Sequence, residues 1–410
     1  MTARPFFFIP TMIPLCRLSL SAVLVLLLSA GPVSAVTLYD RGGTHLALGG
    51  ELQAAYYSRN ADYDGALDTG DASLYAAGVL AIEGRTALGG GSEAYAHADW
   101  DMPDGWGHTG FDLKAMYIGV EGEGWGRVQL GTFEDAFYYA QESVDVFDEF
   151  AGLGIFDSSE KQGMFLYAWE GGGLTVQLSY QSAKSSQGVE GAYLPRTTYS
   201  SDDGLGEERG TLDIEYALAL GAGYALADAG GGPLAVRAGV GYTDFGPHRD
   251  AGSGYYRNQL AAGSASDASA VRYARYRQWG ASLSWGEPDA GAYAALHYER
   301  RLITLRSATA GAPAGGLELS GASLAAGYTT PGGLSMYAGL EYVQVEVDGA
   351  RAQALILPLY VLCRLTPHLE IWAEARIDLD TDDGGDGDYL ALTDHDLTHH
   401  IYSVGLRLMF

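Results

Sequence analysis

The last ten residues of the chain, Ile401-Tyr402-Ser403-Val404-Gly405-Leu406-Arg407-Leu408-Met409-Phe410, indicate the fold class. Apolar or aromatic side chains stand at positions 402, 404, 406, 408 and 410, and Ser403, Gly405 and Arg407 stand between them. Successive side chains of a β-strand point to opposite faces, so this period of two predicts a strand with one face for hydrocarbon and one for water. Such a strand suits the wall of a transmembrane β-barrel.

The same alternation recurs along most of the chain, clearly in 174–181, 212–220, 334–342 and 369–379. It predicts sixteen strands, at 44–58, 72–86, 92–102, 109–121, 126–136, 161–169, 174–183, 210–225, 234–245, 277–286, 291–303, 318–330, 334–346, 353–365, 368–379 and 399–410. Each is about as long as a tilted membrane strand needs to be, and an even number is typical of a closed antiparallel barrel.

The connections between these segments alternate in length. Short glycine-rich turns such as 89–91, 122–124, 171–173 and 331–333 lie between long polar stretches such as 184–209, 246–276, 304–317 and 380–398. Short turns on one side and long loops on the other are the layout of an outer-membrane barrel. A β-sandwich of this length as one unit would be unusual, and the chain lacks the fixed repeat of a propeller. The fold class is therefore all-β, a 16-stranded antiparallel transmembrane barrel.

Composition excludes several other classes. The 410 residues carry 24 Lys+Arg against 51 Asp+Glu, a net charge of −27, so most of the surface would repel a nucleic acid. Two cysteines exclude a disulfide scaffold. A 47% hydrophobic content is far above that of a disordered acidic chain. The mean hydropathy of −0.02 shows that the apolar residues are dispersed, apart from one run at the N-terminus.

That N-terminal run predicts a signal peptide over residues 1–35, cleaved after Ala35. Arg4 and Arg17 precede an apolar stretch at 18–30, and Val33-Ser34-Ala35 supplies small residues for the cleavage site. A membrane anchor is the less favoured interpretation, because the run is shorter than a spanning helix. Loss of the two arginines changes the net charge from −27 to −29. Residues 36–410 are then one outer-membrane barrel domain of a Gram-negative bacterium, with Cys363 as its remaining thiol.

One connection, 137–160, is unusually apolar for a solvated loop. It contains Val144, Val146, Phe147, Phe150, Leu153, Ile155 and Phe156, and also Asp145, Asp148, Glu149 and Asp157. An external loop has no reason to carry so many apolar side chains. We therefore expect this loop to fold inward, with its apolar side on the inner barrel wall and its carboxylates facing the lumen of a sixteen-stranded barrel.

Four patches of sequence resemble the general bacterial porins, the trimeric outer-membrane diffusion channels of enteric type. These patches are the tyrosine-led start at 38–50, the strand pair 116–131, the acidic stretch 145–152, and the closing Phe410 with its alternating partners. The resemblance implies a homotrimer in outer-membrane lipid and lipopolysaccharide, assembled by the barrel assembly machinery through the Phe410 strand. Ala76, Gly78 and Gly119, expected on the outer face, would suit the trimer contact.

The resemblance also implies a constriction. Asp145, Asp148 and Glu149 would be its acids, and Lys114, Lys161, Arg85 and Arg127 would be its bases. Glu51, Ala77 and Thr132 stand where the family often has basic residues, so the basic half is thinned. Excess carboxylate raises the local concentration of cations, which predicts a cation-preferring channel for small hydrophilic solutes and ions. Screening in a wide pore would flatten this preference.

A second function, also that of a channel, stays open. A solute-specific channel with a saturable binding site would show aromatic side chains along the lumen, and Trp372, Tyr337 and Tyr293 face inward by parity without forming a track. An outer-membrane hydrolase lacks an inward Ser/His pair, so no enzyme activity is predicted. The acidic loop 378–388 departs from the EF-hand pattern, and we find no other metal or cofactor motif.

Overall fold

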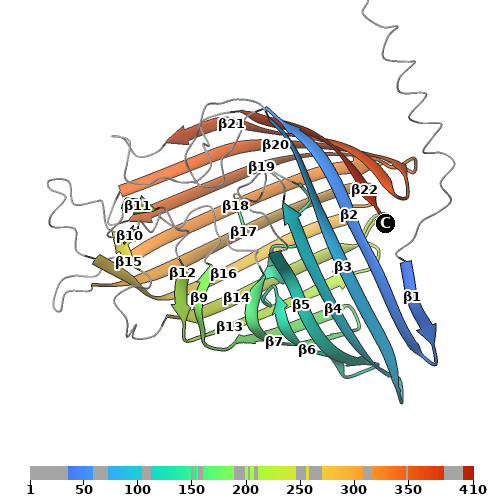
Figure 1. Cartoon of the computed structure of the whole chain (residues 1–410). Coiled ribbons are helices and arrows are strands. Elements are labelled where there is room, and N and C mark those ends of the chain that lie inside the picture. Colours follow the sequence, from blue (N-terminus) through green and yellow to red (C-terminus); the bar gives the residue numbers. More distant parts are fainter. Residues whose placement is uncertain are drawn as a thin grey trace, which may run out of the picture.

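The chain folds into a closed β-barrel (Figure 1). The computed structural model describes residues 36–58, 73–103, 112–148, 152, 154–155, 160–188, 199–201, 204–206, 211–245, 255–257, 270–307, 316–347, 350–382 and 400–410. Eighteen strands form one sheet. Sixteen of them close into a ring, because β2 (Thr44–Tyr57) pairs with β3 (Ser73–Gly89) on one side and with β22 (Ile401–Met409) on the other. Neighbours in the ring are antiparallel, so the prediction of a 16-stranded antiparallel barrel is confirmed.

The ring contains fourteen strands besides β2 and β22, and a few short strands lie outside it. The other ring strands are β4 (Ser92–Pro103), β5 (Asp112–Gly122), β6 (Gly126–Phe133), β7 (Lys161–Gly171), β8 (Leu174–Gln181), β13 (Tyr216–Leu226), β14 (Leu234–Asp244), β16 (Ala270–Glu287), β17 (Ala290–Ser307), β18 (Gly316–Thr329), β19 (Leu334–Val347), β20 (Ala350–Thr366) and β21 (Leu369–Asp382). β1 (Val36–Arg41) and β15 (Tyr255–Arg257) extend the sheet. β9 (Lys184–Gly188) pairs with β12 (Thr211–Ile214), and β10 (Tyr199–Ser201) pairs with β11 (Gly204–Gly206).

Helical structure in the described residues is confined to one 3-10 turn, η1 (Tyr138–Ala140). No helix in that part of the chain is long and apolar enough to cross a membrane.

Two of the predicted strands differ from the observed ones in an informative way. The segment predicted at 210–225 is divided, because β12 pairs with β9 outside the ring while β13 joins the barrel between β8 and β14. The segment predicted at 126–136 ends as a strand at Phe133, where the chain leaves the wall and starts the inward loop. Alternation identifies a strand, but it does not say with which neighbour each residue pairs.

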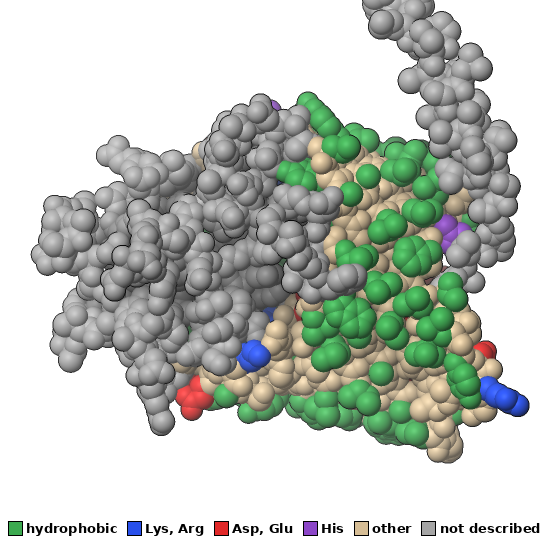
Figure 2. Space-filling model, in the orientation of Figure 1, with side chains coloured by type: hydrophobic (Ala, Val, Ile, Leu, Met, Phe, Trp, Pro, Cys, Tyr) green, Lys and Arg blue, Asp and Glu red, His purple; other side chains and the backbone are tan. Residues whose placement is uncertain are grey.

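The outer face of the wall is apolar, as the period of two predicts. Exposed leucine, valine, isoleucine and methionine side chains cover it, and on the face shown in Figure 2 the charged side chains lie at the margins. Exposed aromatic residues lie near both strand ends: Tyr56, Tyr180 and Tyr402 near the long loops, and Trp125, Tyr224 and Tyr328 near the short turns. Aromatic girdles at both membrane interfaces are typical of an outer-membrane barrel.

One placement expected from the sequence is wrong. Ala76 is exposed on the outer wall, and Gly78 lies there beneath the Leu52 side chain. Gly119, however, is buried on the inner face, where a Cβ would overlap the ring of Tyr95. Its neighbour Ile118 is 60% exposed on the outer face, and alternation then turns Gly119 inward. Gly119 therefore cannot belong to an outer contact surface.

Candidate pore constriction

The connection between β6 and β7 folds into the barrel and packs on its inner wall. Phe137 is 1% exposed, and Ala136, Ala140, Val144 and Ile155 are buried. Val144 and Ile155 pack with inward-facing aromatic residues of the wall, and Val146 and Phe147 lie against the same cluster. The predicted inward fold of the apolar side is therefore observed for these four side chains. Phe150, Leu153, Phe156 and Asp157, also part of the prediction, lie outside the described residues.

Glycines on the inner wall make room for this loop. A Cβ at Gly221 would meet Ala136 and Tyr139, one at Gly239 would meet Phe137, and one at Gly339 would lie 2.8 Å from the Phe147 ring. These glycines lie on β13, β14 and β19, so the loop follows the wall over a wide arc. The loop can lie close to the wall because the wall lacks side chains at these points.

Three buried glutamates of the wall hold the loop in place. Gln141 donates its side-chain amide to Glu299 at 2.7 Å. The Asp148 N–H donates to Glu374 at 2.9 Å, and the Gly152 N–H donates to Glu341 at 3.0 Å. The three glutamates are at most 2% exposed and lie on β17, β19 and β21. Each contact satisfies a buried polar group of the wall, so together they attach the loop to three strands.

Sequence reasoning did not find this set of glutamates. The one sequence signal for them is alternation. Glu341 and Glu374 fall on the inward face of strands whose outward face is apolar. Nearer the start of the loop, Ser179 Oγ accepts from the Ala136 N–H at 2.9 Å, and Tyr293 donates its hydroxyl proton to the Ser143 carbonyl at 2.5 Å.

A β-bulge turns Lys114 into the lumen. Asp99 of β4 faces Ala115 of β5, but the next residue, Trp100, faces Leu113, so Lys114 is the extra residue. Leu113 is 40% exposed on the outer wall, whereas Ala115 is buried inside and its N–H donates to Asp99 at 2.6 Å. Without the bulge, Lys114 would share the outward parity of Met116 and Ile118. Bulges often redirect a side chain in this way next to a functional site.

Lys114 is surrounded by carboxylates. It interacts electrostatically with Asp99 and Asp101 of β4, with Glu134 and Glu160 at the two ends of the loop, and with Asp145 on the loop. Asp145 contacts solvent and accepts a hydrogen bond from the Tyr138 hydroxyl at 2.6 Å. The structure therefore brings the predicted acid Asp145 and the predicted base Lys114 to the same part of the lumen, together with four further acids.

The surrounding protein shifts the acidity of two loop carboxyls. Partial desolvation by the surrounding protein raises the pKa of Asp145, although the residue still contacts solvent. The hydrogen bond from Tyr138 opposes this effect, and repulsion from Asp148 adds to it. Desolvation likewise raises the pKa of Glu160 to about 7, with repulsion from Glu134 adding to the shift and attraction to Lys114 opposing it. The charge of the constriction therefore depends on pH near neutrality.

The other predicted bases lie elsewhere in the barrel. Arg85 is bound by Glu83 at 2.5 Å, Glu93 at 3.0 Å and Glu121 at 3.2 Å, near the short turns. Arg127 lies beside that group, because it faces Glu121 across β5 and β6. The structure thus places both arginines in a separate charged group near the mouth of the lumen.

Lys161 and Asp148 are each held in an ion pair. Lys161 is 5% exposed and pairs with Asp135 at 3.2 Å at the base of the loop. Asp148 is bound to the wall, because Arg407 of β22 lies 2.5 Å from its carboxylate and Tyr360 donates to it at 3.3 Å. Glu149 lies outside the described residues. Among the described residues, no group of three His, Cys, Asp or Glu side chains is arranged to hold a metal ion.

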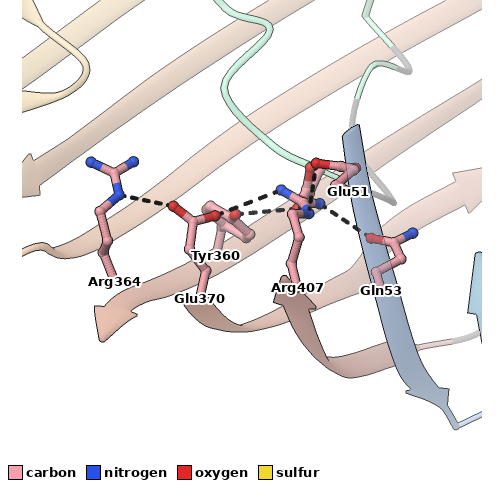
Figure 3. Close-up of polar contacts among 7 residues, drawn as sticks. Glu51, Gln53, Tyr360, Arg364, Glu370 and Arg407 are labelled. Atoms are coloured by element: carbon pink, nitrogen blue, oxygen red, sulfur yellow. Dashed lines mark hydrogen bonds and ion pairs between the residues drawn. The ribbon is translucent and has the colours of Figure 1, made fainter. Parts of the chain in front are cut away.

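Arg407, which the sequence did not indicate as a site residue, is the centre of a polar cluster on the inner wall (Figure 3). Its guanidinium lies 3.3 Å from Gln53, 3.6 Å from Glu51 and 3.9 Å from Glu370. Arg364 binds the other side of Glu370 at 2.9 Å. The cluster joins β2, β20, β21 and β22 to the loop. Its signal in the sequence is an arginine on the inward face of the last strand.

Comparisons with known proteins agree with this architecture. A family model described as Gram-negative porin matches residues 21–350. OmpT of Vibrio cholerae in its trimer form is 15% identical and has a TM-score of 0.62, over 90% of this chain and 100% of that one. OmpF of Salmonella typhi is 13% identical with a TM-score of 0.63, over 90% and 98%.

An anion-selective porin of Comamonas acidovorans is 14% identical with a TM-score of 0.54, over 90% of this chain and 100% of that one. Comparison with curated protein sequences finds no match. At these identities the solved structures show the fold, and the family model, which covers most of the chain, shows the family. The chain belongs to the Gram-negative porins and is a β-barrel of the outer membrane.

Proposed function

We propose that this porin is a water-filled channel for passive diffusion of small hydrophilic solutes and ions, with a preference for cations. The observation that supports this most directly is the charge around Lys114, where one lysine interacts with five carboxylates. Fixed negative charge in a narrow lumen raises the local concentration of cations and lowers that of anions.

The roles of the constriction residues follow from where they lie. Asp145, Glu134, Glu160, Asp99 and Asp101 supply the negative potential, and Lys114 partly offsets it. Asp148 holds the loop to the wall, since its charge is matched by Arg407 at 2.5 Å. Arg85, Arg127 and Lys161 are each opposed by nearby carboxylates and contribute little net positive charge to the narrow part of the lumen.

The reversal potential under a KCl gradient, recorded across a planar bilayer that holds the purified protein, tests this function. Stepwise ohmic insertions with a cation-selective potential are expected. An anion-selective potential would mean that Lys114 and the arginines dominate, and a complete lack of conductance would contradict the channel itself. The anion-selective porin of Comamonas acidovorans shows why the experiment is needed, since the same fold carries the opposite preference in that protein.

The solute-specific alternative has less support. Trp372, Tyr337 and Tyr293 do face inward, but they are 1%, 7% and 6% exposed and pack beneath the loop. A track for a sliding solute needs ring faces open to the lumen, so these three side chains support the loop instead. Saturable block of the current by one solute would favour the alternative.

For assembly we propose a homotrimer in outer-membrane lipid and lipopolysaccharide, inserted by the barrel assembly machinery through β22 and Phe410. The trimer form of the Vibrio cholerae relative supports the first part. The outer faces of β3 and β4 carry the small residues Ala76, Ala94, Ala96 and Ala98, which would let a neighbouring wall approach closely beside the exposed Leu74. The apolar outer face and aromatic girdles support the lipid contact.

A further inference from the structure

The seam at which the barrel closes also holds the far part of the constriction loop. β22 is the last strand, and its pairing with β2 completes the ring. Arg407 on β22 faces inward with 15% of its side chain exposed. Its Nη2 lies 2.5 Å from Asp148 of the loop and 3.3 Å from Gln53 of β2. Its Nε lies 3.6 Å from Glu51 of β2.

The polar groups of Asp148 are engaged mainly by the barrel wall. Arg407 and the Tyr360 hydroxyl both donate to Oδ2, and the backbone N–H of the same residue is bound by Glu374. Asp148 is thus held by three strands, β20, β21 and β22. Asp145, three residues earlier, is bonded within the loop by Tyr138 instead. The two acids that the sequence places together therefore differ in what they contact.

We propose that Arg407 is a further positioning residue of the constriction loop beside the three wall glutamates, and that its ion pair with Asp148 helps to set how far the loop narrows the channel. The planar guanidinium suits this position because it donates in several directions at once, toward the loop, β2 and β21, which a lysine ammonium on a flexible stem does poorly. The expected change in current rests on the proposed channel function, whereas the attachment of the loop by Arg407 does not.

A consequence for assembly follows from the topology. Arg407 meets Glu51 and Gln53 only when β22 has paired with β2, since these residues are far apart in sequence. The loop lies about 260 residues before its anchor in the chain. The contact between Asp148 and the Arg407 cluster therefore needs β22 in place beside β2.

The test uses four variants of the full-length protein in detergent: Arg407→Gln, Asp148→Asn, the double variant, and Arg364→Gln as the matched control. Arg364 is also an inward arginine paired with Glu370, but its ion pair joins β20 to β21 and not to the loop. Retarded or heat-modifiable migration in gels checks that each barrel is closed. Hydrogen exchange of the loop peptide containing the Asp148 and Gly152 amides is then measured, followed by single-channel noise in planar bilayers.

Faster exchange of these amides and a noisier, larger single-channel current are expected in Arg407→Gln and Asp148→Asn. A much smaller effect is expected in Arg364→Gln, because Arg364 shares Glu370 with Arg407 but does not contact the loop. The double variant should be no worse than the more affected single variant, because both changes remove the same contact. Wild-type exchange in both single variants with closed barrels would overturn the proposal. If Arg407→Gln does not close its barrel, Asp148→Asn alone decides the matter. A wild-type protein that does not conduct would contradict the channel function. The hydrogen-exchange result would still test whether Arg407 holds the loop.

Discussion

At the scale of single residues, the surroundings of a carboxylate decide what it does. Asp145 contacts solvent in the lumen and interacts with Lys114, whereas Asp148 forms an ion pair with Arg407 of the wall. In high-dielectric surroundings a unit charge about 8 Å away contributes roughly 0.5 kcal/mol, or about a twofold change in local ion concentration. One exposed acid at the constriction therefore has a measurable effect on selectivity, and a paired one has much less.

The first prediction concerns Asp145. Asp145→Asn should lower the ratio of cation to anion permeability about twofold, because it removes one charge from the narrow part of the lumen. Reversal potentials at pH 8 and low salt, where screening is weak, measure the change. The control is Glu121→Gln, which removes an inward charge from the Arg85 group near the short turns. Equal effects of the two variants would contradict a special role for Asp145.

The second prediction concerns pH. The pKa of Glu160 is raised to about 7, so its carboxylate is ionised above that pH and neutral below it. Cation preference should be greatest above pH 8 and should fall as the pH drops through 7. Reversal potentials recorded between pH 5 and 9 measure this. In Glu160→Gln the step near pH 7 should disappear, and a step that persists in that variant would assign it to another group.

At the scale of elements, the loop and the wall fit each other through residues that are small in the wall and large in the loop. Gly239 and Gly280 leave space for Phe137, and Gly339 leaves space for Phe147. The bulge in β5 is a second device at this scale, because a single extra residue moves Lys114 from the lipid side to the lumen. Both devices act through backbone geometry and not through the chemistry of the residue alone.

The third prediction follows from this fit. Gly239→Val should displace the loop, because a Cβ there would lie 2.9 Å from the Phe137 ring and 3.3 Å from Ala140. Overpacking of this kind costs about 1–3 kcal/mol. We expect an altered single-channel conductance and a lower midpoint of thermal unfolding. Gly90→Val serves as the comparison, because it strains the backbone without touching the loop. At Gly90 a Cβ would meet nothing within 4 Å, but the backbone has φ +63°. Unchanged conductance in Gly239→Val would show that the loop does not depend on this contact.

At the scale of the whole molecule, the outer wall has two kinds of surface. Most strands present leucine, valine and aromatic side chains to the lipid, whereas β4 and the middle of β3 present small residues such as Ala76, Ala94 and Ala96, next to the exposed Leu74. A smooth apolar surface beside bulkier ones fits a contact between neighbouring barrels, and closed symmetric oligomers are the rule for such assemblies.

The fourth prediction compares two outward alanines. Ala96→Arg on β4 should break the trimer into monomers, because a charged side chain would enter the contact between barrels. Ala238→Arg on β14, also exposed on the outer wall, should cost up to about 2–4 kcal/mol of stability and leave the trimer intact. Native gels and light scattering in detergent measure the oligomer. A trimer that survives Ala96→Arg would place the contact on other strands.

The sequence by itself determined the barrel. Alternation of side chains, turn spacing and an even number of strands follow from local chemistry, because the period of two directly records which face meets lipid. The same local signals located the inward loop, since its apolar residues need a wall to pack against. Phe133, where the chain leaves the wall, lay only a few residues inside the predicted strand end.

Only the tertiary structure decided the site. The resemblance assigned Lys114 to the pore, but only the bulge shows how its side chain leaves the outward parity of Met116 and Ile118. Gly119 was expected on the outer face, whereas its alternation with the exposed Ile118 turns it inward. The sequence could not pair Asp148 with Arg407, or the loop with Glu299, Glu341 and Glu374, because these partners lie far apart in the chain and meet only across the closed barrel. Local pattern fixes which face a residue takes, while long-range pairing fixes what it touches.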